Sequence, residues 1–468
     1  MRFLLEMTAV FCLASMLASC TMAPKYERPS PELRLDWAAG SVPQPQANAT
    51  QQGWRDVIED ASTRHLVELA LVNNRDLRVA ALRIEKAQAQ YQIQRADLFP
   101  KIDAGAGANM QRTPASLSPT GLPMTTRAYS VGLGFSAFEL DFFGRIQSLR
   151  GAALEQFLAT EASHRSAELS LVAQVATGYF ALAADREHLK LAKDILQTEQ
   201  ASYELVRQRY ELGTVSRLDL SQAQTTVDTA RVSVAVYAAQ VTADENILEL
   251  LVGMPLSPEL LPAQSLADIA PLRPVPAGLP SEVLTRRPDV LAAEHQLKAA
   301  NANIGAARAM HFPTISLTGS YGTASNEVRD LFRNGFQAWT FIPQITLPIF
   351  HSGAISAGVK AAEADKAIMV AQYEKTVQAA FREVSDCLAQ EASLADQVEA
   401  LGSLSNATGQ AFELTNQLYE AGVGSYLSRL DAQRAHAQTR QNLIGAQMAH
   451  TANRLTLFKA LGGTWASE

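Results

Sequence analysis

Cysteine is scarce in this chain of 468 residues, and its three positions exclude a disulfide framework. Cys12 lies within residues 1–19, in which Arg2 precedes an apolar run, Met7–Ser19, that is too short to cross a bilayer. Such a segment is typical of a secretion signal that is removed from the mature protein. If Cys20 carries lipid, Cys387 has no partner and no internal disulfide forms. We therefore expect packing to stabilise the protein, with Cys387 as a small buried hydrophobe.

The chain also lacks the patterns of catalysis and of nucleic-acid binding. Its formal net charge is -7 and it has no basic stripe, which argues against a nucleic-acid partner. The eight histidines are scattered without the spacing of metal ligands. Neither a nucleophile elbow nor a phosphate-binding loop occurs. The sequence therefore predicts a protein that is not an enzyme, has no catalytic residues and needs no cofactor.

The N-terminal segment ends in Leu17-Ala18-Ser19-Cys20, a pattern similar to the signal of bacterial lipoproteins. In such signals cleavage precedes the cysteine, and acyl chains join its sulfur and its new amino group. The following residue is Thr21 rather than aspartate, which favours the outer membrane over the inner one. We predict a covalent lipid on Cys20.

The most informative pattern is an internal repeat. Residues 76–102 align with residues 289–315 at a shift of 213, with nine identities in 27 positions. Residues 210–224 align with 419–433 at a shift of 209. Each copy is predicted to form a helix, two strands, a very long helix, a tight turn and a further helix. A proline-rich segment joins the copies and is typical of an extended linker.

The repeat predicts the boundaries of the chain's parts. They are a signal peptide 1–19; a lipid-anchored N-terminal segment 20–65; a first repeat 66–255, with a helix about 66–98, strands about 102–110 and 129–140, a long helix 144–212 and a helix 216–253; a linker 256–281; a second repeat 282–463, with a helix about 283–311, strands about 314–322 and 338–349, a long helix 353–421 and a helix 425–461; and a tail 464–468.

Four segments alternate apolar with small polar residues at a period of two: Ile102–Met110, Tyr129–Ala137, Ile315–Tyr321 and Trp339–Ile349. Their length spans a bilayer as tilted strands. A soluble sandwich is the alternative, but the rest of the chain is predicted to be helical. An open four-stranded sheet leaves unpaired edges in lipid, and four strands are too few to close a barrel. The pattern predicts an oligomer that shares one barrel, without distinguishing two copies from three.

Two stretches of about 70 residues, 144–212 and 353–421, lack proline and repeat apolar residues at helical spacing. Each helix would be about 100 Å long, several times the thickness of a bilayer. Their alanine-rich composition suits coiled-coil packing in a tube outside the membrane, and a solid bundle is the alternative. Both helices end at matched turns, which we take as candidate docking points: Gly213, Thr214, Val215 and Ser216 in the first, and Gly422, Val423, Gly424 and Ser425 in the second.

Several motifs together resemble the outer membrane factor family, the TolC-like channels, and in particular its lipoprotein branch that serves RND multidrug efflux pumps. The motifs are residues 24–29 (PKYERP), 139–145 (ELDFFGR), 279–290 with RRPDV, 299–308, 430–434 (LDAQR) and 459–463 (KALGG). They span nearly the whole mature chain.

The resemblance implies an α+β membrane protein. Three chains would share a twelve-stranded transmembrane β-barrel, four strands from each, continuous with a long periplasmic helical coiled-coil barrel and an equatorial domain. The implied partners are two further copies of the chain, a periplasmic adaptor (membrane fusion) protein, which would dock at the hairpin turns, an inner-membrane RND transporter and outer-membrane lipid.

The implied function is that of an outer-membrane exit channel passing drugs and other small toxic compounds to the exterior. A duct for type I protein secretion or for metal-ion export is the alternative, because the inner-membrane pump selects the substrate. A purely structural coiled-coil lipoprotein leaves the four strands unexplained.

Leu427, Asp431 and Arg434 are predicted to form a periplasmic gate. Their spacing places them on one helical face, just after the second turn. In a symmetric oligomer each becomes a ring, and the resembling family has its constriction at matching positions. A solvated Asp–Arg pair on a surface is the alternative. The resemblance also implies that Asp219 and Tyr419 help to hold the channel closed; a favourable acid at a helix N-terminus equally explains Asp219.

Overall fold

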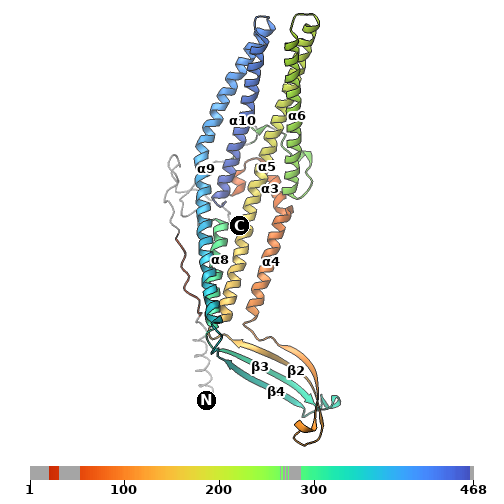
Figure 1. The fold of residues 1–468 in the computed structure, drawn as a ribbon, viewed down its shortest axis with the longest axis vertical. Coiled ribbons are helices and arrows are strands. Elements are labelled where there is room, and N and C mark those ends of the chain that lie inside the picture. Colours follow the sequence, from red (N-terminus) through yellow and green to blue (C-terminus); the bar gives the residue numbers. More distant parts are fainter. Residues whose placement is uncertain are drawn as a thin grey trace. The chain divides into compact units, whose positions relative to one another are not determined.

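The computed structural model describes residues 21–30, 53–263, 265, 266, 269, 272 and 286–463. These residues form a mixed fold that is mostly helical, with one sheet (Figure 1). Its helices are α2 (Trp54–Val57), α3 (Ala61–Asn73), α4 (Arg75–Ala96), α5 (Arg145–Glu211), α6 (Arg217–Val252), α8 (Pro288–Ala309), α9 (Ala354–Glu420) and α10 (Tyr426–Ala460). Its strands are β1 (Asp103–Thr113), β2 (Met124–Leu140), β3 (Thr314–Ser325) and β4 (Gln337–Thr346), and short 3₁₀ turns occur at Ala115–Leu117, Pro258–Leu260 and Val328–Asp330.

The described residues fall into two compact units. One combines residues 21–30 with Arg83–Glu161 and Ala292–Glu374, and it contains the sheet. The other contains α3, α6 and α10 with the parts of α5 and α9 that begin at Ala162 and Lys375, and so the tips of both helical hairpins, α5–α6 and α9–α10. The predicted signal segment, Cys20, most of the linker and the tail 464–468 lie outside the described residues.

The single helix predicted over about 66–98 is wrong, because the chain bends at Asn74 between α3 and α4. The Asn74 backbone is extended, with φ -60° and ψ 129°. Its side-chain oxygen accepts a hydrogen bond from the Leu77 backbone nitrogen at 2.8 Å, and its side-chain nitrogen donates to the Leu251 carbonyl at 2.7 Å. Asn74 therefore ends one helix, caps the next and ties the bend to α6.

The hairpin unit has a continuous apolar core. Residues from α3, α5, α6 and α10 contribute to it, among them Leu66, Val172, Leu248 and Leu455, each no more than 1% exposed. Among the described helices only α5 contains a window apolar enough to cross a membrane, and most of that window is buried inside the protein. Burial of this kind is typical of a helix packed inside a protein. It is compatible with the prediction that the long helices lie outside the membrane.

The sheet is antiparallel with the order β1-β2-β3-β4 (Figure 1). Within the part of the chain that the structure describes, no strand pairs with the outer edge of β1 or of β4. All of β4 and nearly all of β1 are exposed to solvent in the single chain. The sheet therefore presents two free edges and two broad faces.

The register gathers apolar residues on one face of the sheet. Leu133 of β2 lies opposite Tyr321 of β3, which in turn lies opposite Trp339 of β4. The neighbouring row on the other face contains Gly132, Gly322 and Ala338. Directly paired residues point to the same side of a sheet, so an apolar face and a face of small residues run across all four strands.

A β-bulge in β2 preserves these faces. Phe135 pairs with Gly319 and Phe138 with Leu317, so β2 advances three residues while β3 advances two. Ala137, inside the bulge, has a positive φ of 51°. The predicted alternation through Ala137 therefore ends at Phe135, and the extra residue returns Phe138 to the apolar face.

Candidate functional site

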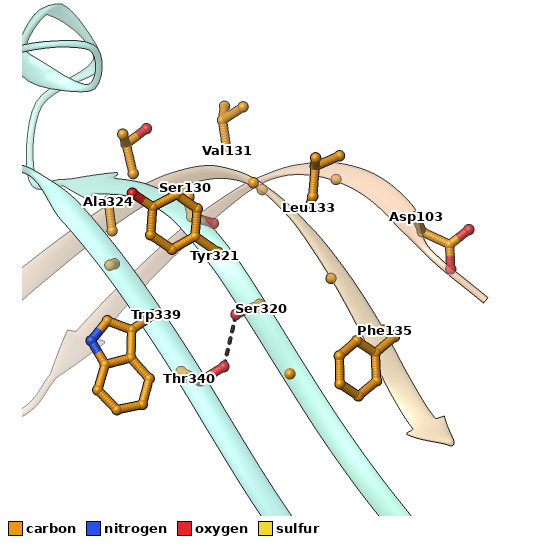
Figure 2. Close-up of a pocket in the computed structure, with 18 of the residues that line it drawn as sticks. Asp103, Ser130, Val131, Leu133, Phe135, Ser320, Tyr321, Ala324, Trp339 and Thr340 are labelled. Atoms are coloured by element: carbon orange, nitrogen blue, oxygen red, sulfur yellow. Dashed lines mark hydrogen bonds between the residues drawn. The ribbon is translucent and has the colours of Figure 1, made fainter. Parts of the chain in front are cut away.

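Two features attract functional interest: the face of small residues on the sheet, and the tips of the helical hairpins. On the sheet, the side chains of Ser320 and Thr340 share a hydrogen bond of 2.7 Å across β3 and β4 (Figure 2). A depression of about 530 Å³ is lined by residues of all four strands, with Ser130, Gly132 and Thr318 from the face of small residues and Phe135, Tyr321 and Trp339 from the apolar face. Most of the polar lining residues are small and uncharged, which suits a water-filled passage.

The first hairpin tip is closed by a Schellman turn. Gly213 has φ 73°; its nitrogen donates to the Tyr210 carbonyl and the Thr214 nitrogen to the Arg209 carbonyl, both at 2.9 Å. These two bonds satisfy carbonyls at the end of α5, and the positive φ favours glycine.

The second tip repeats this geometry. Gly422 has φ 77°, and the nitrogens of Gly422 and Val423 donate to the carbonyls of Tyr419 and Leu418 at 3.1 Å. A Cβ atom on Gly424 would lie 2.9 Å from the Tyr419 nitrogen, so a larger residue has no room there. Both tips are thus rigid turns. They carry exposed apolar side chains, with Val423 77% exposed.

The helices after the turns are capped differently. Ser216 accepts a hydrogen bond from the Asp219 nitrogen at 3.1 Å, and the Asp219 carboxylate accepts from the Ser216 nitrogen at 2.9 Å and from its hydroxyl at 2.7 Å. These hydrogen bonds hold the pKa of Asp219 below its usual value. At the second tip Ser425 accepts from the Ser428 nitrogen at 3.0 Å, without an acidic partner. Within this chain, these hydrogen bonds of Asp219 form a capping box for its own helix.

Tyr419 lies between the two hairpins. Nη1 of Arg209, on α5, donates to the Tyr419 hydroxyl at 3.2 Å. The guanidinium groups of Arg209 and Arg429 lie 5.4 Å and 5.7 Å from the centre of its ring. The Tyr426 ring is 5.7 Å away. Tyr419 therefore connects α9 to α5 and α10. These contacts are compatible with the predicted role of Tyr419 in holding the hairpins together.

Arg429 extends this connection, and sequence reasoning missed it. The residue is 7% exposed; its Nε donates to the Asn416 side-chain oxygen at 2.6 Å and its Nη1 to the Ser202 hydroxyl at 3.0 Å. Arg429 thus joins three helices, α10, α9 and α5. Glu199 and Thr226, bonded at 2.7 Å, add a buried polar contact between α5 and α6 nearby in sequence.

The three predicted gate residues share one face of α10. Leu427, Asp431 and Arg434 are all exposed, whereas Leu430 and Gln433 on the adjoining flank of the helix are buried. No ion pair or hydrogen bond is found for Asp431 or Arg434 among the residues that the structure describes. The side chains of Asp431 and Arg434 therefore have no partner among the described residues of this chain. In particular, they do not form the Asp–Arg ion pair that was the alternative to a gate.

Comparison with known proteins identifies the family and agrees with the fold. A family model described as outer membrane efflux protein matches residues 66–254 and 279–463. The chain is 44% identical over 456 residues to the probable efflux pump outer membrane protein TtgC of Pseudomonas putida, covering 97% of this chain and 94% of the relative. It is 42% identical over 460 residues to the outer membrane protein OprJ of Pseudomonas aeruginosa, covering 97% and 95%.

Solved structures give the same result. The open state of the MtrE outer membrane channel of Neisseria gonorrhoeae matches with a TM-score of 0.85 and 36% identity, covering 95% of this chain and 98% of that one. A membrane protein from Pseudomonas aeruginosa matches with a TM-score of 0.90 and 41% identity, covering 95% and 98%.

The sheet, the long hairpins and these similarities define an outer-membrane channel. The chain belongs to the outer membrane efflux protein family. This confirms the predicted family, localisation and class of function, and its relatives are efflux proteins rather than enzymes.

Proposed function

We propose that this protein is the exit channel of a tripartite RND-type efflux pump, and that it passes antibiotics, solvents and other small toxic compounds out of the cell. Its relatives support this choice, since they include outer membrane proteins of antibiotic, toluene and solvent efflux pumps. Its partners in the pump are a periplasmic adaptor, docked at the Gly213–Ser216 and Gly422–Ser425 turns, and an inner-membrane transporter.

The observation that carries the proposal is the four-stranded sheet with an apolar face, a face of small residues and two free edges. Free edges are not tolerated in lipid, because each unpaired backbone group there costs several kcal/mol. The edge of β1 must therefore pair with β4 of another copy. Three copies with four strands each form a twelve-stranded barrel, with the apolar face toward lipid and the small residues toward the passage.

The repeated order of elements supports descent from one duplicated unit. α4, β1, β2, α5 and α6 follow one another as α8, β3, β4, α9 and α10 do, and α5 and α9 each contain 67 residues. In the trimer these helices form a tube below the barrel. Leu427, Asp431 and Arg434 form rings that narrow its end, Tyr419 holds the hairpins together, and Asp219 caps the helix beside them.

Complementation tests the proposal. A Gram-negative strain that lacks its efflux channel but keeps the adaptor and the RND transporter should regain resistance to organic antibiotics and solvents when this protein is expressed. The purified protein should cross-link in detergent to a limit of three copies and conduct ions in a planar bilayer. Conduction with resistance restored only to metal ions, or with restored secretion of a protein toxin, would replace the organic-compound proposal with the corresponding alternative.

A further inference from the structure

The N-terminal segment that follows the predicted lipid site lies along one face of α8. Glu294, Lys298, Asn301 and Gly305 recur at intervals of four, three and four residues, which places them in one stripe on that helix. Each of the four lies against the segment Thr21–Arg28, hereafter the strap, as the distances below show. The strap and this stripe belong to the same compact unit.

A buried carboxylate holds one end of the strap. The Glu294 side chain is 4% exposed and accepts hydrogen bonds from Arg28 Nη2 at 2.5 Å and from the Tyr26 hydroxyl at 3.3 Å. Lys298 Nζ lies 3.0 Å from the same carboxylate and 5.3 Å from the centre of the Tyr26 ring. Burial opposes ionisation, but the hydrogen bonds from Arg28 and Lys298 keep the pKa of Glu294 below its usual value. The carboxylate is thus charged and paired.

Two further contacts hold the other end. The buried Asn301 side chain donates to the Pro24 carbonyl at 2.7 Å. A Cβ atom on Gly305 would lie 2.6 Å from the Ala23 nitrogen, so only glycine lets the strap approach α8 so closely. The Thr21 hydroxyl then lies 3.2 Å from that of Ser148, on α5.

The lengths of the two elements match. From Ala23 to Arg28 an extended chain advances about 17 Å, at roughly 3.3 Å per residue. From Gly305 back to Glu294 a helix also covers about 17 Å, at 1.5 Å per residue. The strap therefore runs antiparallel to α8, extended beyond a bend at Ala23, and its N-terminal end lies at the end of α8 that leads into β3.

We propose that the strap is a positional clamp, which holds the lipid-bearing N-terminus at the level where the membrane-spanning strands begin. This proposal rests on the channel of the proposed function and on the acylation of Cys20 predicted from the sequence. Cys20 is three residue steps from Ala23, which span at most about 10 Å, whereas the ten steps from Cys20 to Ser30 of an undocked segment would reach about 35 Å. Docking thus turns a loose tether into a fixed point of attachment beside the sheet.

Trypsin cleavage of the purified full-length channel tests the clamp. The strap has one usable site, Lys25–Tyr26, because Pro29 blocks cleavage after Arg28. Release of the N-terminal peptide is followed by mass spectrometry. Cleavage of the wild type should be slow, and Glu294→Gln should accelerate it at least about tenfold, the change expected for the loss of 1.4 kcal/mol or more from a charge-assisted contact.

A variant on the strap itself tests the same contact without altering a helix, so a folding defect in the Glu294 variant does not leave the test undecided. Arg28→Ala should accelerate cleavage as Glu294→Gln does, and the double variant should not be faster than the faster single one, because both remove the same contact. Glu155→Gln is the matched control: it removes another carboxylate bound to α8, 2.6 Å from His295, and should leave cleavage unchanged. Wild-type cleavage as fast as that of the variants, or additive effects, would overturn the clamp.

The same samples separate this proposal from the proposed function. If the wild type conducts normally but trypsin cuts rapidly after Lys25, the clamp is rejected and the channel is kept. If Lys25 resists trypsin in a protein that does not conduct, the channel is rejected and the clamp is kept. A released peptide without acyl chains shows that the strap docks but positions no lipid, which also overturns the clamp.

Discussion

Arg209 and Tyr419 join the two helical hairpins close to their tips, with Nη1 of the arginine 3.2 Å from the tyrosine hydroxyl. They come from α5 and α9, which lie in different halves of the sequence. We expect a contact between hairpins at this position to limit how far the tips separate. Separation of the tips is the motion that an exit channel closed at its lower end needs in order to open.

The exposed row on α10 gives the first prediction. Leu427→Ala combined with Asp431→Ala should raise single-channel conductance at least about twofold and sensitise cells to vancomycin, because it removes both an apolar ring and a ring of carboxylates from the constriction. Leu218→Ala with Gln222→Ala, the corresponding pair on α6, is the control and should have neither effect. Unchanged conductance in the α10 variant would rule out this gate.

The buried arginine gives the second prediction. Arg429→Met fills a similar volume but leaves Asn416 and Ser202 without their donor, at a cost of about 2 kcal/mol. This corresponds to a change of roughly thirtyfold in an equilibrium between joined and separated tips. Planar-bilayer recordings should therefore show longer open periods. Tyr419→Phe, which removes only one hydroxyl, should act in the same direction and more weakly. If Arg429→Met only lowers stability and leaves the open periods as they were, the residue has a packing role alone.

Asp219 distinguishes capping from closure. Asp219→Ala removes the capping box and should destabilise the start of α6 by about 1 kcal/mol, which hydrogen exchange at the tip can measure. Asp219→Ser, which restores a capping oxygen acceptor, should recover part of this loss. Conductance that rises in both variants would assign Asp219 to the closure instead.

Asp244 predicts a dependence of stability on pH. Burial, together with the neighbouring Asp185, raises the pKa of Asp244 to about 6. In the unfolded chain an aspartate has a pKa of about 3.9, so the folded state binds the proton more tightly. Stability is therefore highest when Asp244 is protonated, falls as the pH rises from about 4 to 6, and is constant above that range as far as this group is concerned.

Asp244→Asn should remove this dependence and stabilise the protein at pH 7.5, because the amide carries no charge for burial and Asp185 to oppose. Thermal unfolding of the solubilised protein at pH 4.5 and pH 7.5, followed by helical circular dichroism, measures it. Asp228→Asn, an exposed acid on the same helix, is the control. An Asn variant less stable than the wild type at pH 7.5 would contradict the prediction.

The lipid on Cys20 is tested by the intact mass of membrane-extracted protein. We expect a chain that begins at Cys20 and carries acyl groups. Cys20→Ala should weaken anchoring but still allow the strands to insert, because they bury most of the apolar surface in lipid. A mass that fits an unmodified N-terminus would exclude lipidation.

The sequence was sufficient where the determining chemistry is local. Gly213 and Gly422 mark turns that need a positive φ, and Ser216 and Ser425 cap the next helix within three residues. The alternation of the strands also predicted the two faces, since side chains in a strand alternate regardless of what they pack against.

Contacts between distant segments were not predictable in this way. Arg429 is an ordinary polar residue in the sequence, and its burial depends on Ser202, which lies 227 positions away. The break at Asn74 also depends on a distant residue, Leu251. The bulge, by contrast, left a sign in the sequence: apolar residues occupy odd positions up to Phe135 and even positions from Phe138 onward. Propensities of single segments do not indicate which helices become neighbours.

That change from odd to even positions limits how the channel wall tolerates insertions and deletions. A single residue lost within Gly132–Phe135 would turn the preceding part of β2 over, exposing Val131 to the aqueous passage and Ser130 to lipid. A loss of Ala137 would instead remove the bulge and leave Phe138 opposite Leu317, so that Phe138 and Leu140 stay on the apolar face and Glu139 on the other. Single changes of length in this strand are therefore expected at the bulge itself, and elsewhere in the strand only in pairs, so the position of a deletion in any natural variant indicates whether its barrel keeps the same lining.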